Sequence, residues 1–310
     1  MVTNATVTEF VLLGFSESPR VQTILFFIFL TIYITTWLGN LTIIVIVIVM
    51  PQFHTPMYFF LANLAVMDIS DSTVTTVKML WGLISHTNSI SYHWCTAQIF
   101  FFHFTGGAVV FFLVIMAVDR YIAIYKPLQY VLIMHQGVCI GLVAGAWLGG
   151  FAHSIVQVAL ILQLPFCEPN ILDNFYCDVP QLIKLACTDT YVTELLMVSN
   201  SGLLLTLIFC ILLASYTVIL VKIRTHVTDG KHKALSTCAA QIIVMSFNFV
   251  PGMFIYDRPF QVFPADKIAS VFYTLITPML NPMIFTLRNR EMKDTIKKMI
   301  RKMITFVIKE

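Results

Sequence analysis

Two charged sites in this sequence stand where charges are otherwise absent, and each could do chemistry. Asp119 and Arg120 are adjacent and follow a stretch, Met79 to Val118, without any Asp, Glu, Lys or Arg. An acidic and a basic side chain placed in this way can form an ion pair that opens and closes as a switch. Alternatively, the two side chains only extend to water at the membrane boundary and have no switching role. Asp68 is the second isolated charge, and its carboxyl group could hold a hydrated cation or proton, or serve only as a structural hydrogen-bonding group.

The composition indicates which elements position these residues. Of the 310 residues, 58% are hydrophobic and only 11% are charged, and the mean hydropathy is +0.84. A typical soluble domain has about 25% charged residues. A soluble enzyme, a disordered regulator and a coiled coil are excluded, because a soluble fold could not cover its surface with so few charges. The net charge of +3, without a basic and aromatic patch, excludes a nucleic-acid partner. The chain is an integral membrane protein.

Uncharged stretches locate the membrane spans. A helix needs about 20 mostly apolar residues to cross about 30 Å of hydrocarbon. The segment Pro51–Pro56 divides the longest stretch in two, and no stretch shows the period-two alternation of a membrane β-barrel. We therefore predict an all-α membrane protein, a single bundle of seven transmembrane helices over residues 1–310. The predicted spans are 23–49, 57–79, 96–120, 138–161, 195–222, 236–257 and 268–287.

The Lys and Arg residues determine the orientation of these spans. Placing the C-terminus inside assigns 14 of the 19 Lys and Arg residues to the cytoplasm, including Arg120, Lys126 and the eight from Arg288 to Lys309. The positive-inside rule therefore puts residues 1–22 outside and the tail, 288–310, inside. Asn4 begins a glycosylation sequon on the outer side. We expect a multi-pass plasma-membrane protein, surrounded by lipid, with a short amphipathic helix in its tail.

Four of the seven cysteines lie on the predicted outer side. Cys95 begins the third span, and Cys167, Cys177 and Cys187 lie in the long loop between the fourth and fifth spans. On an oxidising face four thiols indicate two disulfides, with three possible pairings. Because loops of this length are uncommon unless they are functional, we expect this loop to cover an extracellular pocket.

Short motifs lie in or beside five of the spans. They are, in chain order, Phe53–Leu61 (FHTPMYFFL), Met116–Ile124 (MAVDRYIAI), Ser215-Tyr216, Lys233–Cys238 (KALSTC) and Pro278–Asn289 (PMLNPMIFTLRN). This set resembles the motifs of olfactory receptors, a family of rhodopsin-like G-protein-coupled receptors, over nearly the whole chain. The loop from Cys177 to Asp189 further resembles the tetrapod-type class, which mainly detects volatile hydrophobic odorants.

The resemblance implies roles for the charged pair. Arg120, in the motif Asp119-Arg120-Tyr121, would pair with Asp119 at rest. On activation it would turn toward Tyr216 and the C-terminal helix of a G protein. Lys126 and the basic third loop would favour an acidic patch on that partner, or reflect membrane topology alone.

The resemblance also places Asp68 beside Asn281 and Pro282 of the seventh span. It would be either a cation site or a structural carboxyl group bonded to Asn40 and Asn281. The acid that the family usually supplies in the third span is Val109 here, which weakens a sodium site.

Three further positions depart from the family pattern. Val118 and Phe285 each stand where the family usually has Tyr, and Gln241 replaces a His of the sixth span that partners the Arg switch. Gln241 can form hydrogen bonds but cannot become a cation, so an activation step that uses histidine charge is in doubt here.

An odorant pocket is implied between spans three, five, six and seven. The implied ligand-facing residues are Phe102, His103, Gly106 and Gly107, then Asn200 and Leu204, then Phe249, Gly252, Met253 and Tyr256, and finally Val271 and Thr274. This wall is mostly apolar and contains no Lys or Arg, so we expect neutral, hydrophobic agonists. Gly106 and Gly107 either leave space for the ligand or allow close helix packing. We interpret His103 as a hydrogen-bonding wall residue and not a metal ligand, because no second His lies one turn away.

The resemblance also pairs Cys95 with Cys177 and Cys167 with Cys187. The resulting prediction is an odorant receptor that activates a heterotrimeric stimulatory, olfactory-type G protein and raises cAMP. It would not be an enzyme and would need no cofactor or metal. One alternative is the same receptor acting as a chemosensor outside olfactory tissue. The other is a transporter or channel, which a ligand-dependent current instead of cAMP would reveal.

Overall fold

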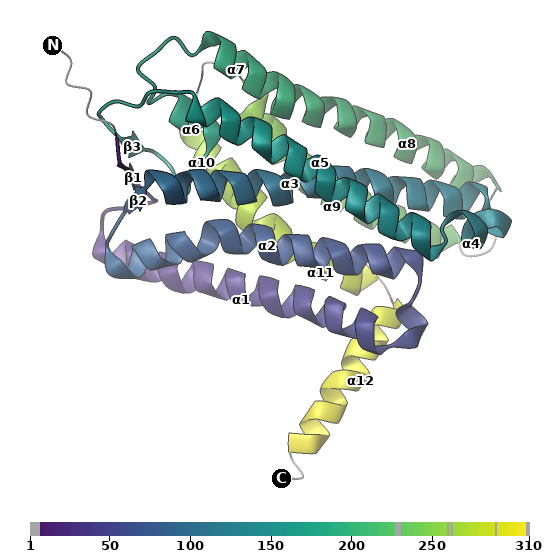
Figure 1. Ribbon diagram of the computed structural model, residues 1–310. Coiled ribbons are helices and arrows are strands. Elements are labelled where there is room, and N and C mark those ends of the chain that lie inside the picture. Colours follow the sequence, from purple (N-terminus) through teal and green to yellow (C-terminus); the bar gives the residue numbers. More distant parts are fainter. Residues whose placement is uncertain (1–6, 227–230, 259–260, 262, 289, 308–310) are drawn as a thin grey trace.

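The computed structural model describes residues 7–226, 231–258, 261, 263–288 and 290–307. Long helices run side by side, with a small sheet at one end of the bundle and a crosswise helix at the other (Figure 1). The first four long helices are α1 (Pro19–Val49), α2 (Pro56–Ser85), α3 (Tyr92–Tyr125) and α5 (Gln136–Leu162). The fifth run joins α7 (Tyr191–Met197), the π-helical η3 (Val198–Leu203) and α8 (Leu204–His226). The sixth is α9 (Lys231–Tyr256), and the seventh joins α10 (Pro264–Val271), the π-helical η4 (Phe272–Ile276) and α11 (Thr277–Arg288).

The predicted seven-helix bundle is confirmed. In the described part of the chain, six helical runs are long and apolar enough to cross a membrane. The remaining helix of the bundle is α2, which packs against α1 and α3. It carries Asp68, Asp71 and Lys78, and these charged residues lower its hydropathy. Both carboxyl groups are buried inside the bundle, so Lys78, near the outer end of the helix, is the one charged residue of α2 that is partly exposed. The helices continue past the predicted spans into the region where the membrane meets water.

Proline and serine residues mark where several helices begin. Pro19, Pro56 and Pro264 occupy first-turn positions, where a backbone N–H has no partner within the helix and proline therefore costs nothing. Ser91 caps α3, because its side chain accepts a hydrogen bond from the Trp94 backbone N–H over 3.3 Å. Short helices occupy the connections: η1 (Pro51–Phe53), η2 (Pro127–Gln129), α4 (Tyr130–Ile133) and α6 (Val179–Ile183).

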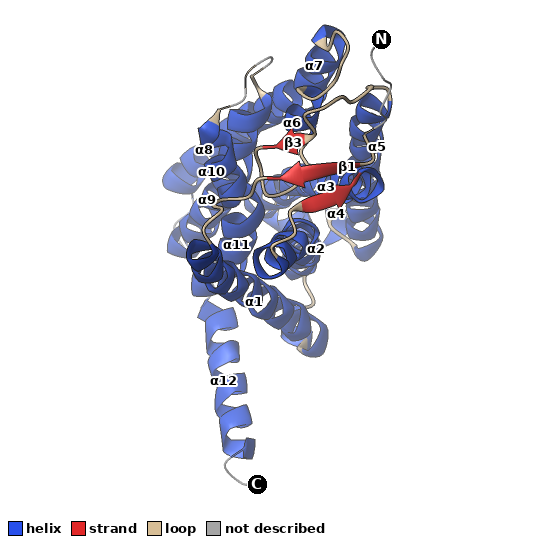
Figure 2. Cartoon of the chain, turned by 90° about the vertical axis from the view of Figure 1, so that its left-hand side faces the viewer, coloured by secondary structure: helices blue, strands red, loops and turns tan. Residues whose placement is uncertain are grey.

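A three-stranded sheet covers the extracellular end of the bundle (Figure 2). Its central strand β1 (Glu9–Leu12) pairs antiparallel with β2 (Ser89–Ser91) and parallel with β3 (Ile171–Leu172). The strands come from the N-terminal segment, the loop before α3 and the long loop after α5. This sheet was not predicted, because each strand is too short to show a pattern of its own.

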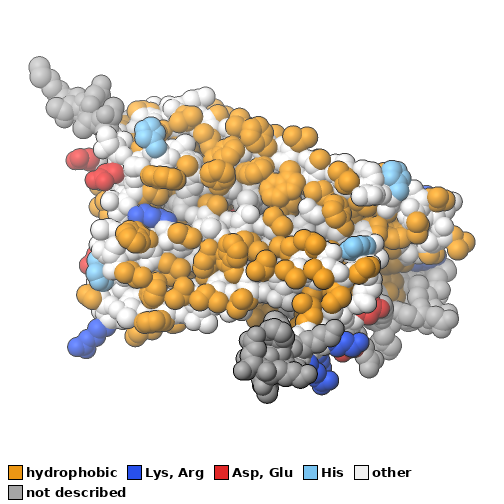
Figure 3. All heavy atoms as spheres, turned by 60° about the horizontal axis from the view of Figure 1, so that its bottom comes forward, with side chains coloured by type: hydrophobic (Ala, Val, Ile, Leu, Met, Phe, Trp, Pro, Cys, Tyr) orange, Lys and Arg blue, Asp and Glu red, His pale blue; other side chains and the backbone are white. Residues whose placement is uncertain are grey.

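The sides of the bundle are apolar where lipid would contact them. Large side chains such as Ile48, Leu148 and Trp81 have more than 60% of their surface exposed. Hydrophobic side chains cover the face in Figure 3, and the charged side chains gather toward its two ends. The distribution is that of a protein whose solvent is hydrocarbon along its sides and water at its ends.

The predicted amphipathic tail helix is confirmed as α12 (Arg290–Val307), which leaves the cytoplasmic end crosswise to the bundle (Figure 1). Met292 is fully buried, and Ile296 and Met299 pack in the same apolar cluster at the inner ends of α1 and α2. Lys293 and Lys297 lie on the exposed side. The spacing i, i+4, i+7 keeps the apolar residues on one face of the helix.

Candidate functional site

A small cavity lies inside the bundle, toward its extracellular half, and its volume is about 30 Å³. Seven of the twelve residues predicted to face a ligand line it: Phe102, His103, Gly106, Gly107, Asn200, Leu204 and Tyr256. Six further lining residues were not predicted: Val110, Phe111, His153, Ser201, Leu205 and Tyr273. The cavity therefore joins α3, α5, η3, α8, α9 and η4.

The other five predicted residues do not line this cavity. They are Phe249, Gly252, Met253, Val271 and Thr274. Phe249 is buried and stacks on Phe209, with ring centroids 5.5 Å apart. Thr274 is buried and donates to the Ser270 carbonyl over 2.9 Å. The π-helical η4 explains part of this difference, because a π-turn changes which side chains face inward compared with a regular α-helix. Tyr273 faces the cavity in place of Thr274.

His103 has an unused hydrogen-bonding atom at this cavity. The residue is 4% exposed, and its Nε2 has no hydrogen-bond partner among the described residues. Its ring lies edge-on to those of His153, at 5.4 Å between centroids, and Tyr256, at 5.8 Å. His153 in turn pairs its Nδ1 with the amide nitrogen of Asn200 at 3.1 Å. A second histidine does lie beside His103, but it comes from the neighbouring helix and not from the next turn of α3.

Glycines bring α3 and α5 close enough for this contact. A Cβ on Gly107 would lie 3.2 Å from the Gly150 Cα and 3.1 Å from the His153 ring. A Cβ on Gly106 would lie 3.0 Å from the Tyr273 hydroxyl oxygen. Gly107 therefore serves close helix packing, and Gly106 leaves room for a polar side chain at the cavity.

Asp178, in the long loop, holds that loop against the sixth transmembrane helix. Its carboxylate accepts hydrogen bonds from the Tyr256 hydroxyl over 2.8 Å, the Tyr176 hydroxyl over 3.1 Å and the Val179 backbone N–H over 2.9 Å. Burial raises the pKa of this carboxyl group to about 6, against the opposing effect of the three hydrogen bonds. The Tyr256 hydroxyl, predicted to face the ligand, is thus engaged by the loop. The sequence showed Asp178 only as one of several acids in the loop.

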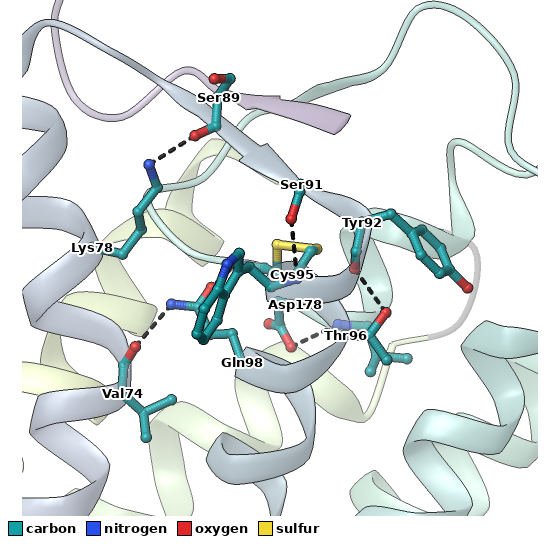
Figure 4. The surroundings of a disulfide bond; sticks show 12 residues. Val74, Lys78, Ser89, Ser91, Tyr92, Cys95, Thr96, Gln98 and Asp178 are labelled. Atoms are coloured by element: carbon teal, nitrogen blue, oxygen red, sulfur yellow. Dashed lines mark hydrogen bonds between the residues drawn. A yellow bond between two sulfur atoms is a disulfide. The ribbon is translucent and has the colours of Figure 1, made fainter. Parts of the chain in front are cut away.

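Two disulfides fix the same loop, with the pairings that the resemblance implied. The Cα atoms are 5.5 Å apart for Cys95 and Cys177, and 5.7 Å apart for Cys167 and Cys187. Gln98 supports the first bridge, because its side chain accepts from the Cys177 backbone N–H over 2.8 Å. It also donates to the Val74 carbonyl over 2.9 Å (Figure 4). The loop is therefore attached to both α2 and α3.

The charged pair lies about 21 Å further along α3, given the 14 residues from Gly106 to Arg120 and a rise of 1.5 Å per residue. The Arg120 Nε donates to an Asp119 carboxylate oxygen over 3.0 Å, and the Tyr130 hydroxyl donates to the other oxygen over 2.7 Å. The Tyr216 hydroxyl donates to the Gln241 side-chain carbonyl over 3.0 Å. The resemblance implies the first pair for a resting receptor, whereas the contact between Tyr216 and Gln241 was not predicted.

The neighbours of this pair are arranged for contact with water or a partner. Tyr121 is 40% exposed and stacks on Tyr125 with centroids 4.4 Å apart. Lys126 caps the C-terminal end of α3, where its backbone N–H donates to the Ile122 carbonyl. Lys126 is exposed. Neither side chain is buried against the bundle.

Asp68 contacts Asn281 as predicted. The Asn281 side-chain amide donates to both Asp68 oxygens, over 2.9 and 3.1 Å. Asn40 instead donates to the Pro278 carbonyl over 3.1 Å, so it joins α1 to the seventh run, and among the described residues it forms no hydrogen bond with Asp68. Pro282, one residue after Asn281, lies in the interior of α11.

Another buried acid, Asp71, lies one turn beyond Asp68 and was not predicted as a site residue. It accepts a hydrogen bond from the Thr105 hydroxyl over 2.9 Å. Asn4, the predicted glycosylation site, lies outside the described residues.

Comparisons with known proteins identify the family of the chain. The family model described as "Olfactory receptor" matches residues 29–303. Olfactory receptor 4D1 of Homo sapiens is 58% identical over 293 residues, which cover 94% of each chain. Olfactory receptor 4N5 of Homo sapiens is 54% identical over 95% of this chain and 96% of the relative. Olfactory receptor 4B13 of Mus musculus is 48% identical over 96% and 97%. The chain belongs to the olfactory receptor family: it is a multi-pass receptor of the plasma membrane and not an enzyme.

Proposed function

We propose that this receptor binds small, mainly neutral hydrophobic odorants in the cavity between α3, α5, η3, α9 and η4. The proposal rests on the chemistry of the lining, which is largely apolar, contains no Lys or Arg, and offers the unpartnered Nε2 of His103. Burial of hydrocarbon supplies most of the affinity, at roughly 25 cal/mol per Å². His103 then orients an odorant that carries one hydrogen-bonding group.

The charges near the cavity disfavour a carboxylate odorant. An anion would enter without a fixed cation, at a desolvation cost of several kcal/mol. Arg258, just beyond the outer end of α9, is a candidate counter-ion, but it forms an ion pair with Asp266 and lies over the rings of Phe254 and Phe263. It is therefore already engaged outside the cavity. Alcohols, ketones, aldehydes, esters and phenols avoid this cost.

The size of the cavity links binding to activation. A volume of about 30 Å³ is roughly a tenth of the smallest ordinary ligand pocket. An odorant fits only when the side chains or helices around the cavity move outward. The agonist therefore stabilises a wider arrangement of the bundle, and the population shifts toward it.

The signalling step takes place at the cytoplasmic end. There Arg120 leaves Asp119 and turns inward, toward Tyr216 and the C-terminal helix of a stimulatory, olfactory-type G protein. The G protein then raises cAMP. Gln241 keeps Tyr216 in place through a neutral hydrogen bond, and Lys126 with the basic third loop attracts an acidic patch on the partner.

A cAMP reporter assay with matched odorant pairs tests this proposal. Each pair compares a neutral compound with a carboxylate of the same carbon skeleton, at equal surface expression of the receptor. We expect the neutral member to be more potent. His103→Ala should reduce the potency of hydrogen-bonding odorants about two- to twelvefold, the effect of one neutral hydrogen bond. Strongest activation by carboxylates, lost in Arg258→Ala, would contradict the proposed site.

A further inference from the structure

A groove lies on the lipid-facing side of the bundle, between the outer parts of α2 and α3. We call it the outer groove, and the residues that characterise it are Val77, Lys78, Trp81, Ser89, Trp94 and Phe101. Its volume is about 550 Å³, which is enough for a lipid head group and the first part of a chain. Four of its side chains are half or more exposed: Val77 at 50%, Phe101 at 51%, Trp81 at 62% and Trp94 at 73%. These surfaces face the membrane and not the core.

The depth of these residues matches a lipid that lies along the membrane normal. Trp81 is one turn from the end of α2 at Ser85, and Trp94 is in the first turn of α3. Both indoles therefore lie at the outer interface, where tryptophan is favoured. Val77 lies about 6 Å deeper than Trp81 and Phe101 about 10 Å deeper than Trp94, at 1.5 Å per residue. The groove is aromatic at head-group level and apolar below it.

Lys78 contributes one positive charge to the lining of the outer groove. Its ammonium group donates to the Ser89 carbonyl over 2.7 Å, as Figure 4 shows. Within the described residues no carboxylate forms an ion pair with it. An ammonium group has three N–H donors, so two remain for an acceptor that is not part of the chain. A lysine inside a membrane-spanning helix is costly unless it meets such a partner.

The floor of the groove is held in place before any lipid binds. Gln98 connects α3 to the Val74 carbonyl of α2 (Figure 4) and to the Cys177 backbone N–H of the loop. The disulfide between Cys95 and Cys177 fixes the same point. The two walls therefore keep their spacing, which lowers the ordering cost of binding.

We propose that the outer groove binds a phosphocholine lipid of the outer leaflet. The phosphate accepts hydrogen bonds from Lys78, and the trimethylammonium group lies against the indole faces of Trp81 and Trp94, which attract a quaternary cation. The acyl chain follows Val77 and Phe101. A zwitterionic head group satisfies both the single cation and the two indoles. An anionic lipid would use only Lys78, and a sterol would leave its charge without a counter-ion.

Photo-crosslinking in nanodiscs tests the proposal. The full-length receptor is placed in phosphatidylethanolamine nanodiscs that contain a trace of photoactivatable phosphatidylcholine, and the labelled peptides are mapped by mass spectrometry. We expect the label to be enriched within residues 74–101. Lys78→Met should reduce this labelling about tenfold to a hundredfold, the range for hydrogen bonds to a charged group. Trp94→Leu should reduce it about two- to fivefold.

Matched variants separate lipid recognition from general damage. Lys78→Arg keeps the positive charge and the N–H donors and should retain most of the labelling. Arg20→Met removes an exposed cation on the same side of the membrane, and Trp37→Leu removes an exposed tryptophan of α1; both should label as wild type.

Three results would overturn the inference. The first is labelling spread evenly over the lipid-facing helices. The second is unchanged labelling in a folded Lys78→Met receptor. The third is stronger competition by phosphatidylglycerol or cholesterol than by unlabelled phosphatidylcholine, which would assign the groove to an anionic lipid or to a sterol.

Discussion

Protonation of Asp178 should stabilise the receptor. This carboxyl group is 2% exposed, and burial raises its pKa from the ordinary value of 3.8 to about 6, although Tyr256, Tyr176 and the Val179 N–H bond to it. Asp266 adds a smaller contribution in the same direction. Because the folded pKa lies above the unfolded one, the folded receptor binds more protons within this interval. The free energy of unfolding therefore falls as pH rises through it.

The size of the effect follows from the two pKa values. Between pH 7 and pH 5 the folded carboxyl group changes from mostly ionised to mostly protonated, while the unfolded one stays ionised. The folded receptor should therefore be about 1.3 kcal/mol more stable at pH 5 than at pH 7 from this group alone. That corresponds to a Tm about 3–5 °C higher, by the scaling for large domains.

Thermal unfolding of purified receptor at the two pH values measures this effect. The readout is the fraction that stays monodisperse in detergent after heating at a fixed rate, which gives an apparent Tm even when unfolding is irreversible. The variant Asp178→Asn cannot ionise, so it should lack the part of the shift that belongs to Asp178 and retain the part from other groups. The reasoning would be refuted if the apparent Tm changed equally in wild type and variant between pH 7 and pH 5. It would also be refuted if, on going from pH 7 to pH 5, the wild type lost more stability than the variant.

Three further predictions concern the switch, the packing and the loop. Arg120→Ala should abolish agonist-driven cAMP at normal surface expression while odorant binding persists, because the cavity is about 21 Å away; preserved signalling would exclude the proposed switch. Gly150→Ala should lower the free energy of unfolding by about 1–3 kcal/mol, because the new Cβ would lie 2.4 Å from a backbone oxygen of α3. The control Gly145→Ala places its Cβ in open space and should behave as wild type in thermal unfolding. Tyr256→Phe should reduce the potency of all agonists by a similar factor, about two- to twelvefold, because the Tyr256 hydroxyl bonds to Asp178 and not to the ligand. A loss of potency confined to hydrogen-bonding odorants in the cAMP assay would contradict this prediction and show that the hydroxyl contacts the ligand directly.

The sequence by itself determined the features that depend on local composition. Each span requires only about 20 consecutive apolar residues, so seven spans could be located without knowing how they pack. The orientation followed from the Lys and Arg residues, because that rule counts charges in loops and ignores contacts. Motif resemblance then located Asp119 and Arg120 at the cytoplasmic end of the third span and paired the four outer cysteines.

The boundaries of the cavity needed the tertiary structure. Gly107 and Gly150 are distant in sequence, and only their close approach places His153 of α5 beside His103 of α3. The sequence offered no second histidine one turn away, so this neighbour could not be found from helical periodicity. Side chains from different helices meet according to packing, which is a property of the whole bundle.

Two further features were decided only by the fold. The π-helical η3 and η4 change which residues face inward, so Tyr273 lines the cavity where the resemblance implied Thr274. The loop residue Asp178 reaches Tyr256, 78 positions later in the chain. Local pattern cannot reveal either one, because a π-turn and a buried carboxylate are both stable only when distant segments supply their packing and hydrogen bonds.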